Sequence, residues 1–173
     1  MRIRIDNEIL ERDLLAGPGE RYVPEIARSA NAFLHNIYRH SKLSPRIFEA
    51  ARIATAIING CVLCKNWRIQ HDLHQLGIKQ GVLNNGQAPN NSFYTALLSG
   101  DHSHLDAREQ LAVRYANNMG LTPIDLSADE LFWRSFKESF DDAEITDLTY
   151  CIAGWMAMGR VFHVLGVDQQ CSL

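Results

Sequence analysis

The chain of 173 residues is 46% hydrophobic and 21% charged, and its formal net charge at pH 7 is -3. This hydrophobic share supports a packed core and excludes a disordered chain, and the length fits one domain spanning residues 1–173. The mixed-sign, slightly acidic charge argues against nucleic-acid binding, because that function needs a basic face toward the phosphate backbone.

Helical patterns fill the N-terminal half of the chain. Apolar residues recur at helical spacing, and prolines stand in the first turn of two segments. Ser44 is a good N-cap for the second segment, and Gly60 and Gly77 are typical of helix C-termini. The predicted helices of this half span residues 23–40, residues 44–60, and a stretch from Cys61 to about Gly77.

The C-terminal half continues this pattern after a polar loop at residues 84–92. Its predicted helices span residues 105–120, 127–140 and 142–166. The second of them opens with a Ser127-x-x-Glu130 capping box. The third is apolar on most faces, which favours a central position or a subunit interface. Strand-type alternation is confined to a brief stretch at residues 2–5, so the predicted fold class is all-α.

The sequence also predicts a soluble, cytoplasmic protein with no membrane partner. The first fifteen residues carry charge throughout and contain no apolar segment, unlike a secretory signal peptide. The longest mainly apolar run, residues 148–159, is shorter than the ~20 residues that span a bilayer. In a reducing compartment, two cysteines close in sequence are expected to be reactive or metal-bound rather than joined in a structural disulfide.

Two of the four cysteines, Cys61 and Cys64, form a CxxC pair at the start of the third predicted helix. Unpaired N–H groups and the positive end of the helix dipole stabilise a thiolate at such a position. The spacing also lets one sulfur attack the other once the latter is oxidised, which gives an intramolecular disulfide. The pattern therefore favours a redox-active pair.

Charged residues near the pair suggest how charge and protons are handled. If one helix continues beyond the cysteines, Arg68 lies one turn past Cys64 and favours its thiolate electrostatically. His71 then returns to nearly the same angle farther along, within reach of a peroxide or a water. Glu49, in the preceding helix, points back at the thiols as a proton acceptor if the two helices pack together.

Other interpretations of these residues stay open. Cysteine is among the most buried residue types, so the pair also fits two inert core residues. A zinc site made by the pair with His71 and His74 is conceivable, but no further ligands follow at zinc-finger spacing, and we expect no metal. Of the other cysteines, Cys151 is expected in the core and Cys171 in an inert tail. His102 and His104 are expected in a cap and loop.

The surroundings of the pair add a longer pattern. Glu49 stands twelve positions before Cys61, the string INGC ends at that cysteine, and Cys64 completes the motif. The segment at residues 142–166 has an acidic start, a long apolar middle and an ending in Arg and Leu-Gly. Over about residues 20–168 the chain resembles the AhpD-like alkylhydroperoxidase and carboxymuconolactone decarboxylase superfamily.

This resemblance implies a compact helical bundle that forms homo-oligomers and acts as a thiol-dependent alkyl hydroperoxide reductase or disulfide reductase. Cys64 would attack the hydroperoxide, and Cys61 would resolve the resulting sulfenic acid. Glu49 would belong to the proton relay. An external dithiol donor, such as a lipoyl protein, would reduce the disulfide, and no bound cofactor is expected.

The chain departs from this family at two histidine positions. Leu63 stands between the cysteines and Arg68 stands four residues after the second, so we expect Arg68 to stabilise the thiolate and His71 to carry protons. Two other functions stay open. One is a non-catalytic or redox-sensing helical oligomer. The other is a carboxymuconolactone decarboxylase-like enzyme acting on a small carbocyclic acid, although that branch works without a CxxC pair.

Overall fold

The computed structural model describes residues 2–3 and 19–168, and none of these residues lies in a strand. The predicted all-α class is therefore confirmed for the described chain, whereas residues 4 and 5 of the strand-like stretch at residues 2–5 lie outside it. The α-helices are α2 (Gly19–Tyr22), α3 (Pro24–His40), α4 (Pro45–Asn59), α5 (Val62–Asn66), α6 (Ile69–Asp72), α7 (Asn91–Ser99), α8 (Ala107–Leu121), α9 (Pro123–Ala128), α10 (Glu130–Ser139) and α11 (Asp142–Leu165). Two short 3-10 helices are η1 (Leu73–Leu76) and η2 (Gly81–Asn85).

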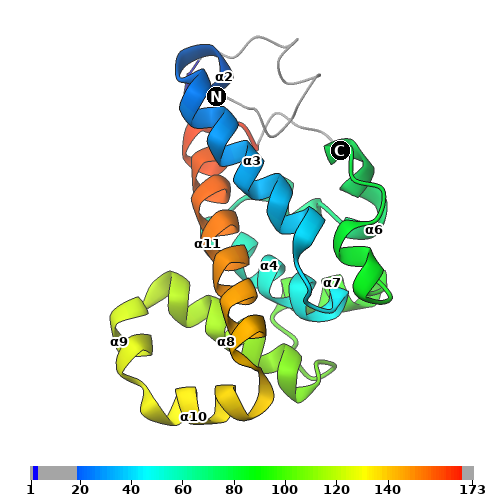
Figure 1. The fold of residues 1–173 in the computed structure, drawn as a ribbon, viewed down its shortest axis with the longest axis vertical. Helices are drawn as coiled ribbons and strands as arrows, with labels where there is room; N and C mark the ends of the chain where they lie inside the picture. Colours follow the sequence, from blue (N-terminus) through cyan, green and yellow to red (C-terminus); the bar gives the residue numbers. More distant parts are fainter. Residues whose placement is uncertain (1, 4–18, 169–173) are drawn as a thin grey trace.

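Helix α4 forms the centre of the fold. It packs against α8 and α11, while α3 lies along α11, and α8, α9 and α10 form a lobe at one end (Figure 1). Twelve of the fifteen residues of α4 are buried, which is more than the single apolar stripe of a surface helix. Phe48 of α4 meets Trp155 of α11 edge to face, with 4.7 Å between the ring centroids. The cysteine pair thus follows directly after the helix with the largest buried share among the described residues.

The predicted boundaries of α4 are confirmed. Ser44 accepts a hydrogen bond from the Ile47 N–H, and Pro45 is the first helical residue. Gly60 ends the helix in the left-handed conformation, with φ of 68°. A Cβ atom at position 60 would also stand only 3.0 Å from the His163 ring. Position 60 therefore needs glycine both for its backbone conformation and for the close approach of this histidine.

The prediction of one continuous helix after the cysteine pair is wrong, because the segment is divided into α5, α6 and η1. Trp67 and Arg68 are extended. Trp67 is buried with its ring centroid 4.9 Å from that of Tyr38, and the Arg68 N–H donates to the Asp72 carboxylate at 2.7 Å. Core packing and this capping bond override the local helical spacing. Gly77 ends η1 with φ of 65°, as its position predicted.

Two further corrections concern the chain after η2. Ser127 is not a cap, since it lies inside α9 and its hydroxyl donates to a carbonyl of the same helix. Asp129 caps α10 instead, by accepting the Phe132 N–H at 2.9 Å. The polar loop predicted at residues 84–92 also contains the start of α7, which Asn90 caps. The starts of α7 and α10 therefore depend on Asn and Asp caps that the spacing of apolar residues does not locate.

The long helix predicted over residues 142–166 is confirmed as α11, and so is its central position. Nine of its residues are buried, and it packs against α3, α4 and α8. By length and composition α11 is long and apolar enough to cross a membrane, in contrast to the shorter estimate from residues 148–159. A single such helix among the described residues is weak evidence, because the core helix of a soluble protein passes the same test.

Candidate active site

The cysteine pair lies at the start of α5, directly after α4. Cys61 and Cys64 form a disulfide, with their Cα atoms 5.3 Å apart. Cys61 is fully buried, and its sulfur accepts a hydrogen bond from the Cys64 N–H at 3.2 Å. Cys64 is only partly buried. Cys64 is therefore the more exposed residue of the pair.

A small cavity of about 50 Å³ lies against Cys64. The indole rings of Trp67 and Trp155 form part of its wall, together with the polar side chains of Arg52 and Asn59. Of the five site residues predicted from the sequence, Cys64 is the one that lines this cavity. The cavity offers a largely apolar space beside Cys64.

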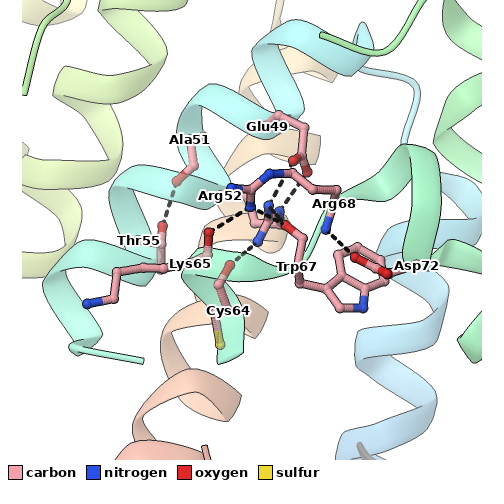
Figure 2. Close-up of polar contacts among 9 residues, drawn as sticks. All are labelled: Glu49, Ala51, Arg52, Thr55, Cys64, Lys65, Trp67, Arg68 and Asp72. Atoms are coloured by element: carbon pink, nitrogen blue, oxygen red, sulfur yellow. Dashed lines mark hydrogen bonds and ion pairs between the residues drawn. The ribbon is translucent and has the colours of Figure 1, made fainter. Parts of the chain in front are cut away.

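A buried ion pair supports the cysteine segment from the other side. The Arg52 guanidinium donates to both Glu49 oxygens, at 2.6 and 2.8 Å, and the two residues are 2% and 0% exposed. Arg52 also donates to the carbonyls of Cys64, at 2.6 Å, and Trp67, at 2.7 Å (Figure 2). Burial by itself would lower the pKa of Arg52, but the Glu49 carboxylate raises it above its ordinary value. The pair thus fixes the backbone that carries Cys64, whose sulfur points away from Glu49 (Figure 2).

Arg68 is held by contacts other than the cysteine sulfur. Its guanidinium lies 4.1 Å from the Tyr94 ring centroid and donates to the carbonyls of Lys65 and Trp67 at 2.6 and 2.9 Å. Burial and the nearby Arg52 charge lower the pKa of Arg68. Burial, followed by the Glu49 carboxylate, raises the pKa of Tyr94. Arg68 is therefore part of a buried charged and aromatic cluster behind the cysteine segment.

The structure brings together some of the predicted site residues but not all. Cys61 and Cys64 are bonded, and Glu49 is linked to the Cys64 backbone through Arg52 rather than to a sulfur. His71 is exposed on α6 and does not line the cavity. Arg68 and His71 do not share a helix face with Cys64, because the helix predicted there is broken at Trp67 and Arg68.

Sequence reasoning missed an acid–histidine pair at the start of α5. Asp168 is 1% exposed, and its carboxylate accepts the Val62 N–H at 2.8 Å. The same oxygen lies 3.0 Å from Nδ1 of His163, whose ring stands beside Gly60. Because Val62 and Asp168 are 106 positions apart, no local pattern connects them.

Arg52 was also missed, although a signal for it existed. It lies three positions after Glu49 on the same helix, which is a spacing at which opposite charges meet. A Glu and an Arg one turn apart, flanked by apolar residues on both sides, indicate a buried ion pair.

No group of three or more His, Cys, Asp or Glu side chains in the described part of the chain is arranged to hold a metal ion. The two histidines expected in a loop, His102 and His104, lie between α7 and α8, where Asp106 caps α8. Cys151 is buried in α11, as expected, and burial followed by the Asp147 carboxylate raises its pKa well above its ordinary value. Cys171 lies outside the described residues.

The site described above rests on the contacts of its own residues. Scans of the chain against protein-family models, curated proteins and solved structures returned no match.

Proposed function

We propose that this protein is a cytoplasmic, thiol-dependent hydroperoxide reductase of the AhpD-like class. The observation that carries the proposal is the unequal environment of the two cysteines. Cys61 is fully buried, whereas Cys64 is partly buried and lines a cavity. A hydroperoxide that enters the cavity meets Cys64 first, and Cys61 is already within bonding distance to complete the reaction.

The chemistry balances with these two residues and an external donor. The Cys64 thiolate attacks the terminal oxygen of the hydroperoxide, the O–O bond breaks, and a sulfenic acid forms on Cys64. The leaving alkoxide takes up a proton from the solvent and becomes the alcohol. The Cys61 thiol then attacks the Cys64 sulfur, which forms the disulfide and releases water. A dithiol donor reduces the disulfide, becomes a disulfide itself and returns both thiols.

The surrounding residues position these sulfurs. Arg52 binds the Cys64 and Trp67 carbonyls, and Glu49 balances its charge, so the short helix that carries Cys64 is anchored to the central helix. Asp168 holds the first N–H of α5 next to Cys61. The proton-carrying role of His71 stays a prediction, and its exposed position on α6 suits exchange with solvent rather than contact with the cavity.

The test is peroxide turnover with several dithiol donors, including a dihydrolipoyl compound. Wild-type protein should consume hydroperoxide catalytically with at least one of them, Cys64→Ser should not, and Cys151→Ser should match wild type because that thiol lies outside the cavity. Reversible disulfide formation without turnover on any donor would contradict the enzyme and favour a redox sensor.

A further inference from the structure

Cys61 is contacted on both sides through its two neighbours in the chain. The His163 ring lies against Gly60, where a Cβ atom would stand only 3.0 Å from Nε2. The Asp168 carboxylate accepts the Val62 N–H at 2.8 Å. Cys61 itself is fully buried between these two contacts. The C-terminal part of the described chain therefore fixes the backbone immediately before and immediately after this cysteine.

The two side chains that make these contacts are bonded to each other. The Asp168 oxygen that accepts the Val62 N–H also lies 3.0 Å from Nδ1 of His163. The Asp168 side chain is fully buried, whereas the His163 side chain is 40% exposed. An ionised carboxylate can only accept, so Nδ1 is the donor, whether the ring is neutral or protonated. His163 thus orients the carboxylate, and the carboxylate in turn holds the first N–H of α5.

Cys64 is held by a different part of the fold. Arg52 of α4 donates to the Cys64 carbonyl at 2.6 Å. Neither His163 nor Asp168 lines the cavity beside Cys64. The two cysteines therefore have separate supports, and the loss of one support should affect one cysteine more than the other.

From these contacts we infer that His163 and Asp168 are positioning residues for the resolving step, because they hold Cys61 in the place from which its sulfur attacks Cys64. An intramolecular attack is fast only while the reacting groups are held together, and a displacement of about 1 Å can slow it about a hundredfold. The inference rests on the proposed function for the assignment of Cys61 as the resolving residue. It predicts that loss of the acid–histidine pair slows the second chemical step and leaves the first unchanged.

Both steps can be followed without any peroxide, by mixing reduced protein with the aromatic disulfide dithiodipyridine. The Cys64 thiolate attacks this disulfide, which leaves one pyridyl group on Cys64 as a mixed disulfide and releases the other as a thiolate. The Cys61 thiolate then attacks the Cys64 sulfur, forms the protein disulfide and releases the second pyridyl thiolate. Every protein carries Cys171→Ser, and Cys151 is buried, so the two absorbance phases report the pair.

Three variants separate the parts of the arrangement. Asp168→Ala removes the acceptor and should slow the second phase about ten- to a hundredfold, with the first phase within about twofold of wild type. Asp168→Asn should restore most of the rate, because its amide oxygen can keep both bonds while its nitrogen replaces Oδ1, which has no partner. His163→Phe keeps a ring beside Gly60 but has no donor, and it should slow the second phase about three- to tenfold, the loss expected for one hydrogen bond.

The matched control is Asp101→Ala, which should show both phases at wild-type rates. Asp101 also accepts a backbone N–H, from Ser103 at 2.9 Å, and it also lies near a histidine, His104, but both side chains are exposed. A second phase at the wild-type rate in His163→Phe would overturn the inference, including the case in which Asp168→Ala does not fold. Equal slowing of both phases, or Asp168→Asn as slow as Asp168→Ala, would also overturn it, because a purely structural role gives those results.

The outcome for the acid–histidine pair is independent of the outcome for the proposed function. A selectively slowed second phase in a protein whose wild type never consumes hydroperoxide would support the positioning role and contradict the reductase. Peroxide turnover by wild type, together with an unchanged second phase in the His163 and Asp168 variants, would support the reductase and overturn the positioning role.

Discussion

The Glu49–Arg52 ion pair gives the sharpest prediction about stability. In Glu49→Gln the guanidinium of Arg52 stays buried, at 2% exposure, but loses its counter-charge. Removing one partner of a buried pair costs about 3–5 kcal/mol, because the remaining charge is left uncompensated. A native domain is typically stable by about 5–15 kcal/mol, so this single change should remove a large share of the free energy of unfolding.

Urea unfolding followed by circular dichroism measures this loss, since the free energy of unfolding falls linearly with denaturant. The matched control is Glu25→Gln, which breaks an exposed ion pair of the same spacing with Arg28 and should leave the unfolding midpoint nearly unchanged. Adding Arg52→Met to Glu49→Gln removes the buried charge but also removes the side-chain donor to the Cys64 carbonyl, whereas the Trp67 carbonyl keeps its bond from Arg68, so recovery should be partial. Equal losses in Glu49→Gln and Glu25→Gln would refute this reasoning.

Four further predictions use different measurements. Arg68→Ala should leave the pH profile of Cys64 alkylation nearly superimposable on that of wild type, since that guanidinium binds two carbonyls and the Tyr94 ring. A rise of about one unit in the apparent pKa of the Cys64 thiol would instead support Arg68 as the thiolate stabiliser. Asp168→Ala should cost about 2–3 kcal/mol in urea unfolding, because a buried charged acceptor of the Val62 N–H is lost, whereas a loss no larger than that of Asp101→Ala in an exposed loop would contradict the capping role. Cys151 should resist iodoacetamide in the folded protein at neutral pH, because its raised pKa keeps the thiol protonated until the pH rises well above the ordinary cysteine range; rapid labelling of its peptide would contradict this. Sedimentation should show a homo-oligomer at micromolar concentration, and a clean wild-type monomer would contradict this. Val164→Glu on the exposed face of α11 should weaken the oligomer, whereas the control Ile124→Glu on α9 should not.

The structure leaves a smaller part of α11 available for a subunit interface than the sequence pattern predicts. The apolar residues of α11 suggested a broad interface, yet Trp155, Met156, Met158 and Phe162 are buried within the chain itself. The exposed large hydrophobic residues on this helix are Tyr150, Val161 and Val164. A periodic apolar pattern shows that a helix face is covered, but it does not distinguish the same chain from a second copy as the cover.

Local signals were sufficient where local interactions decide the structure. Ser44, Pro45 and Gly60 act within one turn of a helix end, so the bounds of α4 were predictable from the sequence. The break at Trp67 and Arg68 was not, because the buried contact with Tyr38 comes from a helix about thirty residues earlier and no spacing rule reports it.

The same distinction applies to the candidate site. The cysteine pair is a contiguous motif, and its residues were identified directly. The cavity beside Cys64 was not predictable, because Asn59 and Trp155 meet only through the packing of α4 on α11, 96 positions apart. The guanidinium that binds the Cys64 carbonyl belongs to Arg52 of the preceding helix, whereas a continuous helix after the cysteines predicts this role for Arg68.

A single-turnover experiment tests the central claim most directly. Reduced protein is mixed with one equivalent of tert-butyl hydroperoxide, and the oxidation state of each cysteine is read by mass spectrometry after trapping. Wild type should lose the Cys61 and Cys64 thiols together as one disulfide, Cys61→Ser should stop at a sulfenic acid on Cys64, and Cys64→Ser should leave the peroxide unconsumed. Sulfenic acid on Cys61 in the Cys64→Ser protein, at the wild-type rate, would contradict the assignment of Cys64 as the residue that attacks the peroxide.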